Sequence, residues 1–343
     1  MATTINNPGW IDWWTSLTGG TSRQSCSAAF PPDRYYCLPD ELPLHLLPRQ
    51  AAEVLRRGAD ANLALNPNCI LTTDGELPSE LSVEAELCSH FALQGTIAWV
   101  RKTAAGFYLP FWLGSRLRDV VDDLRRKGTA ARTLSSDDQN LLLMAGILRP
   151  DDETGQSAEE RISRAATMFQ QKQYAPIAQL IHPFHVAALR RYYRYLIRSG
   201  AIRLGDRQTE RRYVAHNEPV ARFFHHLLTA PISSMAGELL KPSYVYLGSY
   251  VGGAELRKHV DREQCEFSIT FCLDFSPEPA LETSWPIQLQ TPTGEVMVYQ
   301  ALGDGLAYRG TRLPHFRGPL AADHTSTSIF FHYVRADFAG ELS

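Results

Sequence analysis

The sequence predicts an α+β fold in which helices precede a C-terminal sandwich or barrel of β-strands. Apolar residues recur every three to four positions over 158–168, 183–199 and 219–239, which is typical of helices. After Lys241-Pro242 the chain changes to short alternating runs rich in Tyr, Val, Ile and Phe, separated by Gly, Pro and Asp. Runs of this kind at this spacing favour an all-β sandwich or barrel.

The N-terminal half is expected to be separate from this β-rich part. Residues 149–155 gather Pro, Gly and acidic residues between periodic stretches, as linkers do. We therefore expect an N-terminal extension over 1–35, a mixed α/β accessory domain over 36–150 and a second domain over 151–343, whose β-rich core spans 242–334. A chain of 343 residues is long enough for two domains.

The accessory domain is predicted to contain a helix, a hairpin and two further helices. Helical spacing covers Leu42 to Leu55, and Thr96 to Leu109 indicates two short strands around a glycine-containing turn. Helices follow over Leu113 to Leu124 and Ser135 to Ile147, the second opening with a capping Ser and first-turn acids. A hairpin followed by helices resembles a small winged-helix-like module. Such modules bind nucleic acid, leader peptides of modified natural products, or nothing.

Composition narrows the range of partners. A net charge of -3 with 21% charged residues speaks against strong nucleic-acid binding, which depends on neutralising phosphates. Arginines concentrated between 190 and 212 are interpreted as a solvated helix face, with an acidic peptide or a carrier protein as the alternative partner.

Cysteine spacing and hydropathy bear on the compartment. The six cysteines show no C-x-x-C pair and are expected to be reduced thiols. The start of the chain lacks the pattern of a signal peptide, and no run approaches the ~18 apolar residues that span a bilayer. We therefore expect a cytoplasmic protein with no membrane partner.

The stretch YVGGAELRKHVD at 250–261 is the most informative about function. Residues two apart in an extended segment point to the same side, so His259 and Asp261 can present an imidazole and a carboxylate to one point. His315 follows after a Gly-Asp-Gly turn and a further strand. Two histidines and one carboxylate on one face of an octahedron leave three positions open, as in non-haem iron(II) oxygenases. The sequence therefore predicts an iron site at His259, Asp261 and His315; His324 competes for the third position, but its flank is typical of a turn.

The same stretch resembles the Y-x-x-G-x-x-Y-x-x-H-x-D segment of the prolyl-hydroxylase-type iron(II)/2-oxoglutarate oxygenases, with Leu256 where that pattern often has a second Tyr. HFRGPL at 315–320 is similar to their H-x-V-x-P-V segment, and 267–274 is similar to the strand after the first ligands. The resemblance covers roughly 242–334. It implies a double-stranded β-helix, a jelly-roll relative of the cupins.

The resemblance also implies an activity. Ferrous iron would be the cofactor and 2-oxoglutarate and O₂ the co-substrates, with ascorbate a further candidate as reductant. The expected reaction is hydroxylation of an unactivated C–H bond in an amino acid, a peptide or a natural-product intermediate. The winged-helix-like region adds a carrier protein or a leader peptide as candidate partners.

One departure from the family pattern concerns 2-oxoglutarate. The family normally has Lys or Arg about ten residues after the distal histidine, to pair with the far carboxylate, whereas this chain has Thr325. Arg317 is the expected replacement, Tyr250 would add a phenol hydrogen bond, and Arg309 is a second candidate. Two alternatives stay open: a cupin-type metalloenzyme that does not use 2-oxoglutarate, and a non-catalytic β-sandwich binding protein with a winged-helix-like module.

Overall fold

The computed structural model describes residues 30–39, 63–101, 108–127, 134–150, 158–205 and 210–342. The chain divides into two compact units, one formed by residues 1–83 and 92–154 and the other by 84–91 and 155–343. The helix expected from Leu42 to Leu55 and most of the expected N-terminal extension lie outside the described residues.

The first unit is built around a small antiparallel sheet. Its elements are β1 (Leu63–Leu65), β2 (Cys69–Thr73), the 3-10 segment η3 (Ser79–Cys88), β3 (Thr96–Arg101), β4 (Tyr108–Leu113), α3 (Ser115–Lys127), α4 (Ser136–Ala145) and β5 (Leu148–Pro150). Strands β2, β3 and β4 form one sheet, and β1 pairs with β5. Ser135 caps α4 by accepting from the Asp138 amide, as its sequence indicates. The predicted pair of strands followed by two helices is confirmed, while the winged-helix resemblance stays a prediction.

The second unit begins with helices and ends with strands. Its first elements are α5 (Ala158–Lys172), β6 (Tyr174–Ile177), α6 (Pro183–Arg198), β7 (Arg203–Leu204), β8 (Arg212–His216) and α7 (Pro219–Ala236). They are followed by β9 (Leu240–Val251), β10 (Leu256–His259), η5 (Glu263–Cys265), β11 (Phe267–Ser276), β12 (Ile287–Thr291), β13 (Gly294–Val298), β14 (Gly305–Arg309), β15 (His315–Arg317) and β16 (Thr325–Arg335). The helices and strands predicted from periodicity in this half are confirmed.

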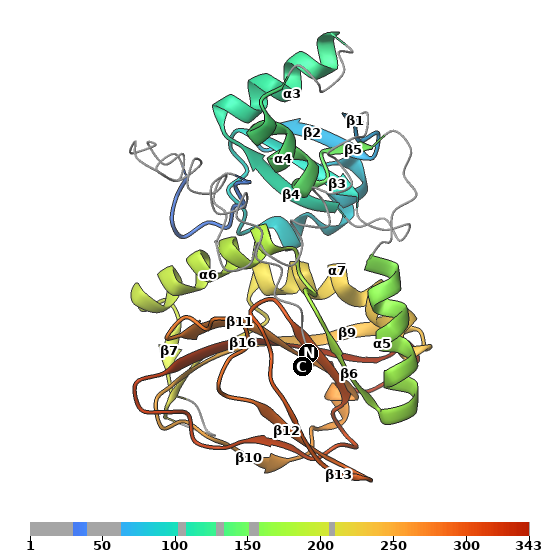
Figure 1. The fold of residues 1–343 in the computed structure, drawn as a ribbon, viewed down its shortest axis with the longest axis vertical. Coiled ribbons are helices and arrows are strands. Elements are labelled where there is room, and N and C mark those ends of the chain that lie inside the picture. The colour runs from blue at the N-terminus through green and yellow to red at the C-terminus, as the bar shows by residue number, and fades with distance from the viewer. Residues whose placement is uncertain are drawn as a thin grey trace. The chain divides into compact units, whose positions relative to one another are not determined.

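The last eight strands are shared between two antiparallel sheets. One sheet has the order β6-β14-β11-β16-β9-β8-β7 and the other β10-β15-β12-β13. From β9 to β12 the chain alternates between the sheets at each strand, and it alternates again from β13 to β16. This is the pattern of a jelly roll, and it brings strands that are distant in the sequence side by side (Figure 1).

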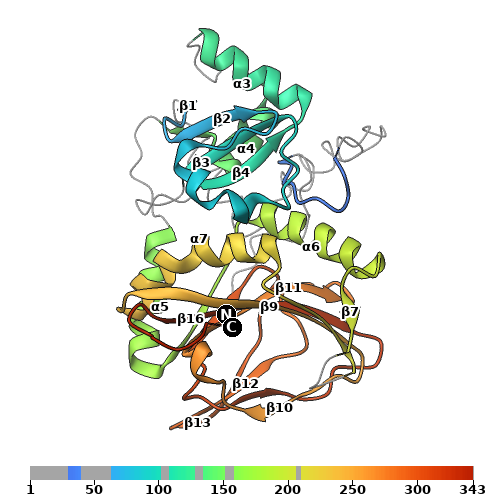
Figure 2. The same ribbon diagram turned by 180° about the vertical axis from the view of Figure 1, so that it is seen from behind.

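Strand alternation gives the larger sheet two different faces. On β9, Val245 and Leu247 are buried on one face, and Tyr246 and Tyr250 point to the other. Helices α6 and α7 lie along the outer face of this sheet (Figure 2). The opposite face looks toward the smaller sheet, where Ile287 and Leu289 pack in a buried apolar cluster. Side chains from both sheets therefore line the interior between them.

Buried ion pairs fix α6 to the sheet. Arg190, only 6% exposed, donates to Asp274 on β11 and to Glu278, and Arg194 donates to Asp274 as well. These two arginines of the basic stretch are therefore bound within the unit. Within the described part of the chain, no helix is long and apolar enough to cross a membrane.

Candidate metal centre

Strand pairing brings the two halves of the predicted iron site together. Strand β10 pairs with β15, and His259 lies directly opposite His315 in the register. Asp261 follows β10 immediately, and its amide donates to the Gly310 carbonyl at 2.9 Å. The three side chains therefore converge on one point, although His259 and His315 are 56 residues apart in the sequence.

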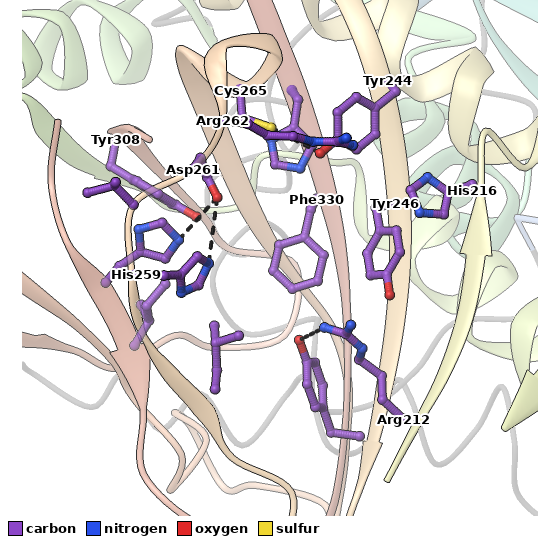
Figure 3. Close-up of a pocket in the computed structure, with 16 residues that line it drawn as sticks. Arg212, His216, Tyr244, Tyr246, His259, Asp261, Arg262, Cys265, Tyr308 and Phe330 are labelled. Atoms are coloured by element: carbon purple, nitrogen blue, oxygen red, sulfur yellow. Dashed lines mark hydrogen bonds and ion pairs between the residues drawn. The ribbon is translucent and has the colours of Figure 1, made fainter. Parts of the chain in front are cut away.

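The orientation of both imidazoles is set by backbone carbonyls. His259 Nδ1 lies 2.8 Å from the Arg257 carbonyl oxygen, and His315 Nδ1 lies 3.0 Å from that of Leu313. Because a carbonyl oxygen only accepts, each Nδ1 must carry the proton, and each Nε2 presents a lone pair. The two Nε2 atoms lie 3.7 and 3.5 Å from Asp261 Oδ1 (Figure 3).

This donor set fits a divalent transition metal. When both imidazoles are neutral and carry their proton on Nδ1, three electron-pair donors face one another within 4.8 Å, so a cation placed among them would remove their mutual repulsion. The histidines keep an Nδ1–H bond to a carbonyl, as metal-bound imidazoles commonly do. The His315 side chain is 3% exposed and that of His259 36%, so the site is closed on one side and open on the other.

The charge state of the carboxylate also suits a metal ligand. Burial alone would raise the pKa of Asp261, but the hydrogen bond and charge of His315 in its protonated form outweigh it and bring that pKa down to about 2. Burial, followed by the charge of His315, lowers the pKa of His259. Both groups are therefore in their ligating forms, carboxylate and neutral imidazole, at neutral pH.

A second layer of contacts holds Asp261. Its Oδ2 accepts from the Ser268 hydroxyl at 2.8 Å, and His332 Nδ1 lies 3.0 Å from the same hydroxyl. A Cβ atom at position 310 would clash with Asp261 Oδ2 and with the Cys265 carbonyl, so only glycine leaves room there. The carboxylate is thus held by a hydroxyl and by close backbone approach, which leaves Oδ1 for the ion.

Replacing Ser268 with alanine is expected to weaken ferrous-iron binding by roughly 10–100-fold, the usual loss when an outer partner of a ligand is removed. The affinity can be measured by anaerobic competition with a coloured chelator. Ser249→Ala is the matched control, because the Ser249 hydroxyl is buried and bonded to Thr327 rather than to a ligand. Equal losses in both variants would contradict an orienting role for Ser268.

A second set of candidate ligands shares Asp261. Asp261, Cys265 and His332 also lie close enough to hold an ion. Burial and the neighbouring Asp261 charge raise the pKa of Cys265 to about 12, so its sulfur stays a protonated thiol and a poor ligand. We therefore favour His259, Asp261 and His315 as the metal site.

A cavity of about 640 Å³ adjoins this centre. It is lined by Arg212, His216, Tyr244, Tyr246, Tyr250, Leu256, His259, Val260, Asp261, Arg262, Cys265, Ile287, Tyr308, His315, Phe330 and His332. Figure 3 shows His259 and Asp261 on one side of the cavity and Arg212, Tyr246 and His216 on the other, with Phe330 between them. An organic molecule can therefore lie beside an ion held by the three ligands.

The candidates for binding 2-oxoglutarate occupy different environments. Tyr250 lines the cavity, and its ring centroid lies 5.2 Å from that of Trp285. Arg317 is two residues after His315 on β15, is 5% exposed and donates to the Trp285 carbonyl at 2.6 Å. Among the described residues, no carboxylate forms an ion pair with Arg317.

Arg309 is engaged elsewhere. Its guanidinium binds Glu238 at 2.5 Å and Glu266 at 2.9 Å and lies 3.9 Å from the Phe267 ring centroid. Because side chains alternate along β14, Arg309 points away from the face that carries Tyr308 into the cavity. The structure thus gives Arg309 a role in stability rather than a place at the site.

His324, the alternative third ligand, and Thr325 are not among the residues of the metal site or the cavity. His324 pairs with Asp323 at 2.7 Å and contacts Phe275, in the turn that the sequence indicated. Thr325, where the family pattern has a basic residue, is exposed at the start of β16. Sequence reasoning missed Arg212, which enters the cavity from β8, opposite Tyr250 in the register. Its only sequence signal was membership of the arginine-rich stretch.

Comparison with protein-family models and with curated proteins finds no match. Among solved structures, the non-heme α-ketoglutarate-dependent epimerase SnoN of nogalamycin biosynthesis is 14% identical, covering 52% of this chain and 82% of its own, with a TM-score of 0.44. A Pseudomonas putida prolyl-4-hydroxylase is 14% identical, covering 50% and 98%, with a TM-score of 0.41. HygX from Streptomyces hygroscopicus, solved with nickel, 2-oxoglutarate and hygromycin B, is 12% identical, covering 51% and 88%, with a TM-score of 0.41. Similarity this low does not support an assignment of function, so the function is inferred from the site itself.

Proposed function

We propose that this chain is an iron(II)- and 2-oxoglutarate-dependent dioxygenase that hydroxylates a C–H bond of an amino acid, a peptide or a natural-product intermediate. The convergence of His259 Nε2, His315 Nε2 and Asp261 Oδ1 beside an open cavity carries the proposal. Two imidazoles and one carboxylate on one side of an ion leave positions free for a co-substrate and O₂. Iron with 2-oxoglutarate would supply the oxidising power there, by coupling decarboxylation of the oxoacid to oxidation of the substrate.

The buried Arg317 supports 2-oxoglutarate as the co-substrate. Burial lowers the pKa of Arg317, and no described carboxylate balances its charge. A buried cation without an anion is costly, so a ligand carboxylate that pairs with it would be bound strongly. Arg317 and His315 lie on the same side of β15, so we assign the far carboxylate of 2-oxoglutarate to Arg317, with Tyr250 adding a phenol hydrogen bond.

The remaining residues of the site exclude water and hold the reactants. Tyr308, Ile287 and Leu256 line the cavity, and burial raises the pKa of Tyr308 well above its usual value, so its phenol stays neutral. The open side at His259 is the way in for substrate.

Anaerobic titration with iron(II) and 2-oxoglutarate tests the proposal. We expect a weak visible charge-transfer band that appears only when iron and 2-oxoglutarate are both present. Iron binding without any spectral response to 2-oxoglutarate would favour a cupin-type metalloenzyme. If neither iron nor 2-oxoglutarate binds, the oxygenase proposal fails and a binding protein becomes the better explanation.

A further inference from the structure

Beside Asp261, a phenol and a thiol meet on the cavity wall. The Tyr244 hydroxyl lies 3.0 Å from Cys265 Sγ, although the two residues are 21 positions apart in the sequence. Both line the cavity, where Tyr244 is 7% exposed and Cys265 1%. Among the described residues that line it, Cys265 is the one cysteine. Figure 3 shows the Cys265 side chain between Asp261 and the Tyr244 ring, so the pair is adjacent to a candidate metal ligand.

Backbone contacts on both sides hold this pair together. Tyr244 lies on β9, and Cys265 ends η5, which follows the ligand segment. The Ser243 hydroxyl donates to the Gln264 carbonyl at 2.5 Å, and these two residues immediately precede the pair. The Cys265 amide donates to the Arg262 carbonyl at 2.9 Å, which closes the turn. The contact between sulfur and phenol is therefore part of the fold and needs no ligand in the cavity.

The pair lies within reach of oxidation at the metal site. A carboxylate oxygen of Asp261 and Cys265 Sγ lie within 4.8 Å of each other, so one carboxylate separates the thiol from an ion held there. A thiol and a phenol give up hydrogen more readily than an unactivated C–H bond does. Arg262 is exposed, and its guanidinium carbon lies 5.0 Å from the Tyr244 ring centroid, so it covers the ring on the solvent side. An oxidised sulfur at this place would meet the Tyr244 ring before it met water.

We propose that Tyr244 and Cys265 become joined by a thioether bond when the loaded metal centre meets O₂ without substrate. Cys265 Sγ loses its hydrogen, the ring carbon next to the hydroxyl-bearing carbon of Tyr244 loses its own, and a single S–C bond forms. The two electrons and two protons from the pair, with the two electrons released when 2-oxoglutarate becomes succinate and CO₂, reduce one O₂. One oxygen atom ends in succinate and the other in water. The inference rests on the proposed function, which supplies the oxidant, and the bond would fix β9 to η5 beside the ligand segment.

Peptide mapping by mass spectrometry tests this bond without any measurement of substrate turnover. The full chain is expressed and purified without oxygen, loaded with iron(II) and 2-oxoglutarate, exposed to air, and then reduced and digested with trypsin. Tyr244 lies in the tryptic peptide 223–257, which has no cysteine, and Cys265 lies in the peptide 263–309. We expect the two peptides to appear as one species whose mass is their sum less two hydrogen atoms. A disulfide cannot produce this species, because the peptide 223–257 offers no thiol.

Variants within the same two peptides identify the joined residues. Tyr244→Phe and Cys265→Ser should abolish the joined species. Tyr246→Phe and Cys272→Ala are the matched controls, because they change a second tyrosine and the second cysteine of these peptides, and both should keep it. A joined species that survives in Tyr244→Phe, or that Tyr246→Phe removes, would place the bond elsewhere and overturn the inference.

The outcomes separate this inference from the proposed function. A wild-type protein that binds iron and 2-oxoglutarate but yields no joined species, or that only adds oxygen atoms to Cys265, would overturn the inference and leave the proposed function standing. A joined species that forms without iron would also overturn it. If the species forms with iron and air whether or not 2-oxoglutarate is present, the bond is supported, with O₂ reduced to hydrogen peroxide, and the result counts against 2-oxoglutarate in the proposed function. If the protein binds no iron and no joined species forms, both fail.

Discussion

Replacing His315 with alanine is expected to abolish ferrous-iron binding. Only His259 Nε2 and Asp261 Oδ1 would remain to face the ion, and the loss should exceed the roughly 10–100-fold effect of removing an outer partner. Iron content after anaerobic loading and desalting measures the result. Unfolding temperature should be followed in parallel, because the His315 ring is buried and lies 4.7 Å from that of Tyr308.

His324→Gln is the matched control for this loss. It is the other histidine that the sequence offered as the third ligand, and it lies with Asp323 in a turn. We expect the His324→Gln protein to retain iron at the wild-type level. If His324→Gln lost iron while His315→Ala kept it, the third ligand would be His324 and not His315. That result would remove the basis of the proposed function.

The three candidate iron ligands could be found in the sequence because their geometry is local. His259 and Asp261 are two residues apart in an extended segment, so their side chains share one side whatever the rest of the fold does. His315 was reached through a resemblance in its flanking residues, and the register of β10 and β15 places it opposite His259. The helices and strands of the second unit could be predicted equally well, because repeats of 3.6 residues in helices and of two residues in strands are properties of single segments.

Cross-strand neighbours could not be predicted in the same way. Arg212 reaches the cavity because β8 pairs with β9 in a register that sets it opposite Tyr250, and no pattern within either strand reveals that pairing. Arg309 is the opposite case, a residue that was expected at the site and lies elsewhere. It follows Tyr308 on β14, so Tyr308 points into the cavity and Arg309 points to the other side of the strand, toward Glu238. The inclusion of 84–91 in the second unit likewise depends on tertiary contacts.

The second large effect is expected at Arg317. Arg317→Met should weaken 2-oxoglutarate binding by about 2–5 kcal/mol, the cost of removing one partner from a buried charged pair. Iron binding should persist, because Arg317 is not among the three ligands. Calorimetric titration of the metal-loaded protein gives the affinity. A 2-oxoglutarate affinity equal to that of the wild type would reject this assignment.

Arg317 should also differ from other buried arginines in its effect on stability. Without ligand, Arg317→Met loses the bond to the Trp285 carbonyl, about 1–3 kcal/mol, but also relieves a desolvated charge that costs several kcal/mol. The ligand-free variant should therefore be as stable as the wild type or more so, while the stabilisation that 2-oxoglutarate gives the wild type should vanish.

Arg309→Met is the matched control, since it removes the same group from a site where two acids already pair with it. It should lose about 1–3 kcal/mol of stability, less than a fully buried pair would, because Glu238 and Glu266 reach solvent. Its affinity for 2-oxoglutarate should be that of the wild type. Loss of 2-oxoglutarate affinity in Arg317→Met alone and loss of stability in Arg309→Met alone would show that Arg317 serves the ligand and Arg309 the fold. If both variants were less stable and both kept the wild-type affinity, Arg317 would have a structural role.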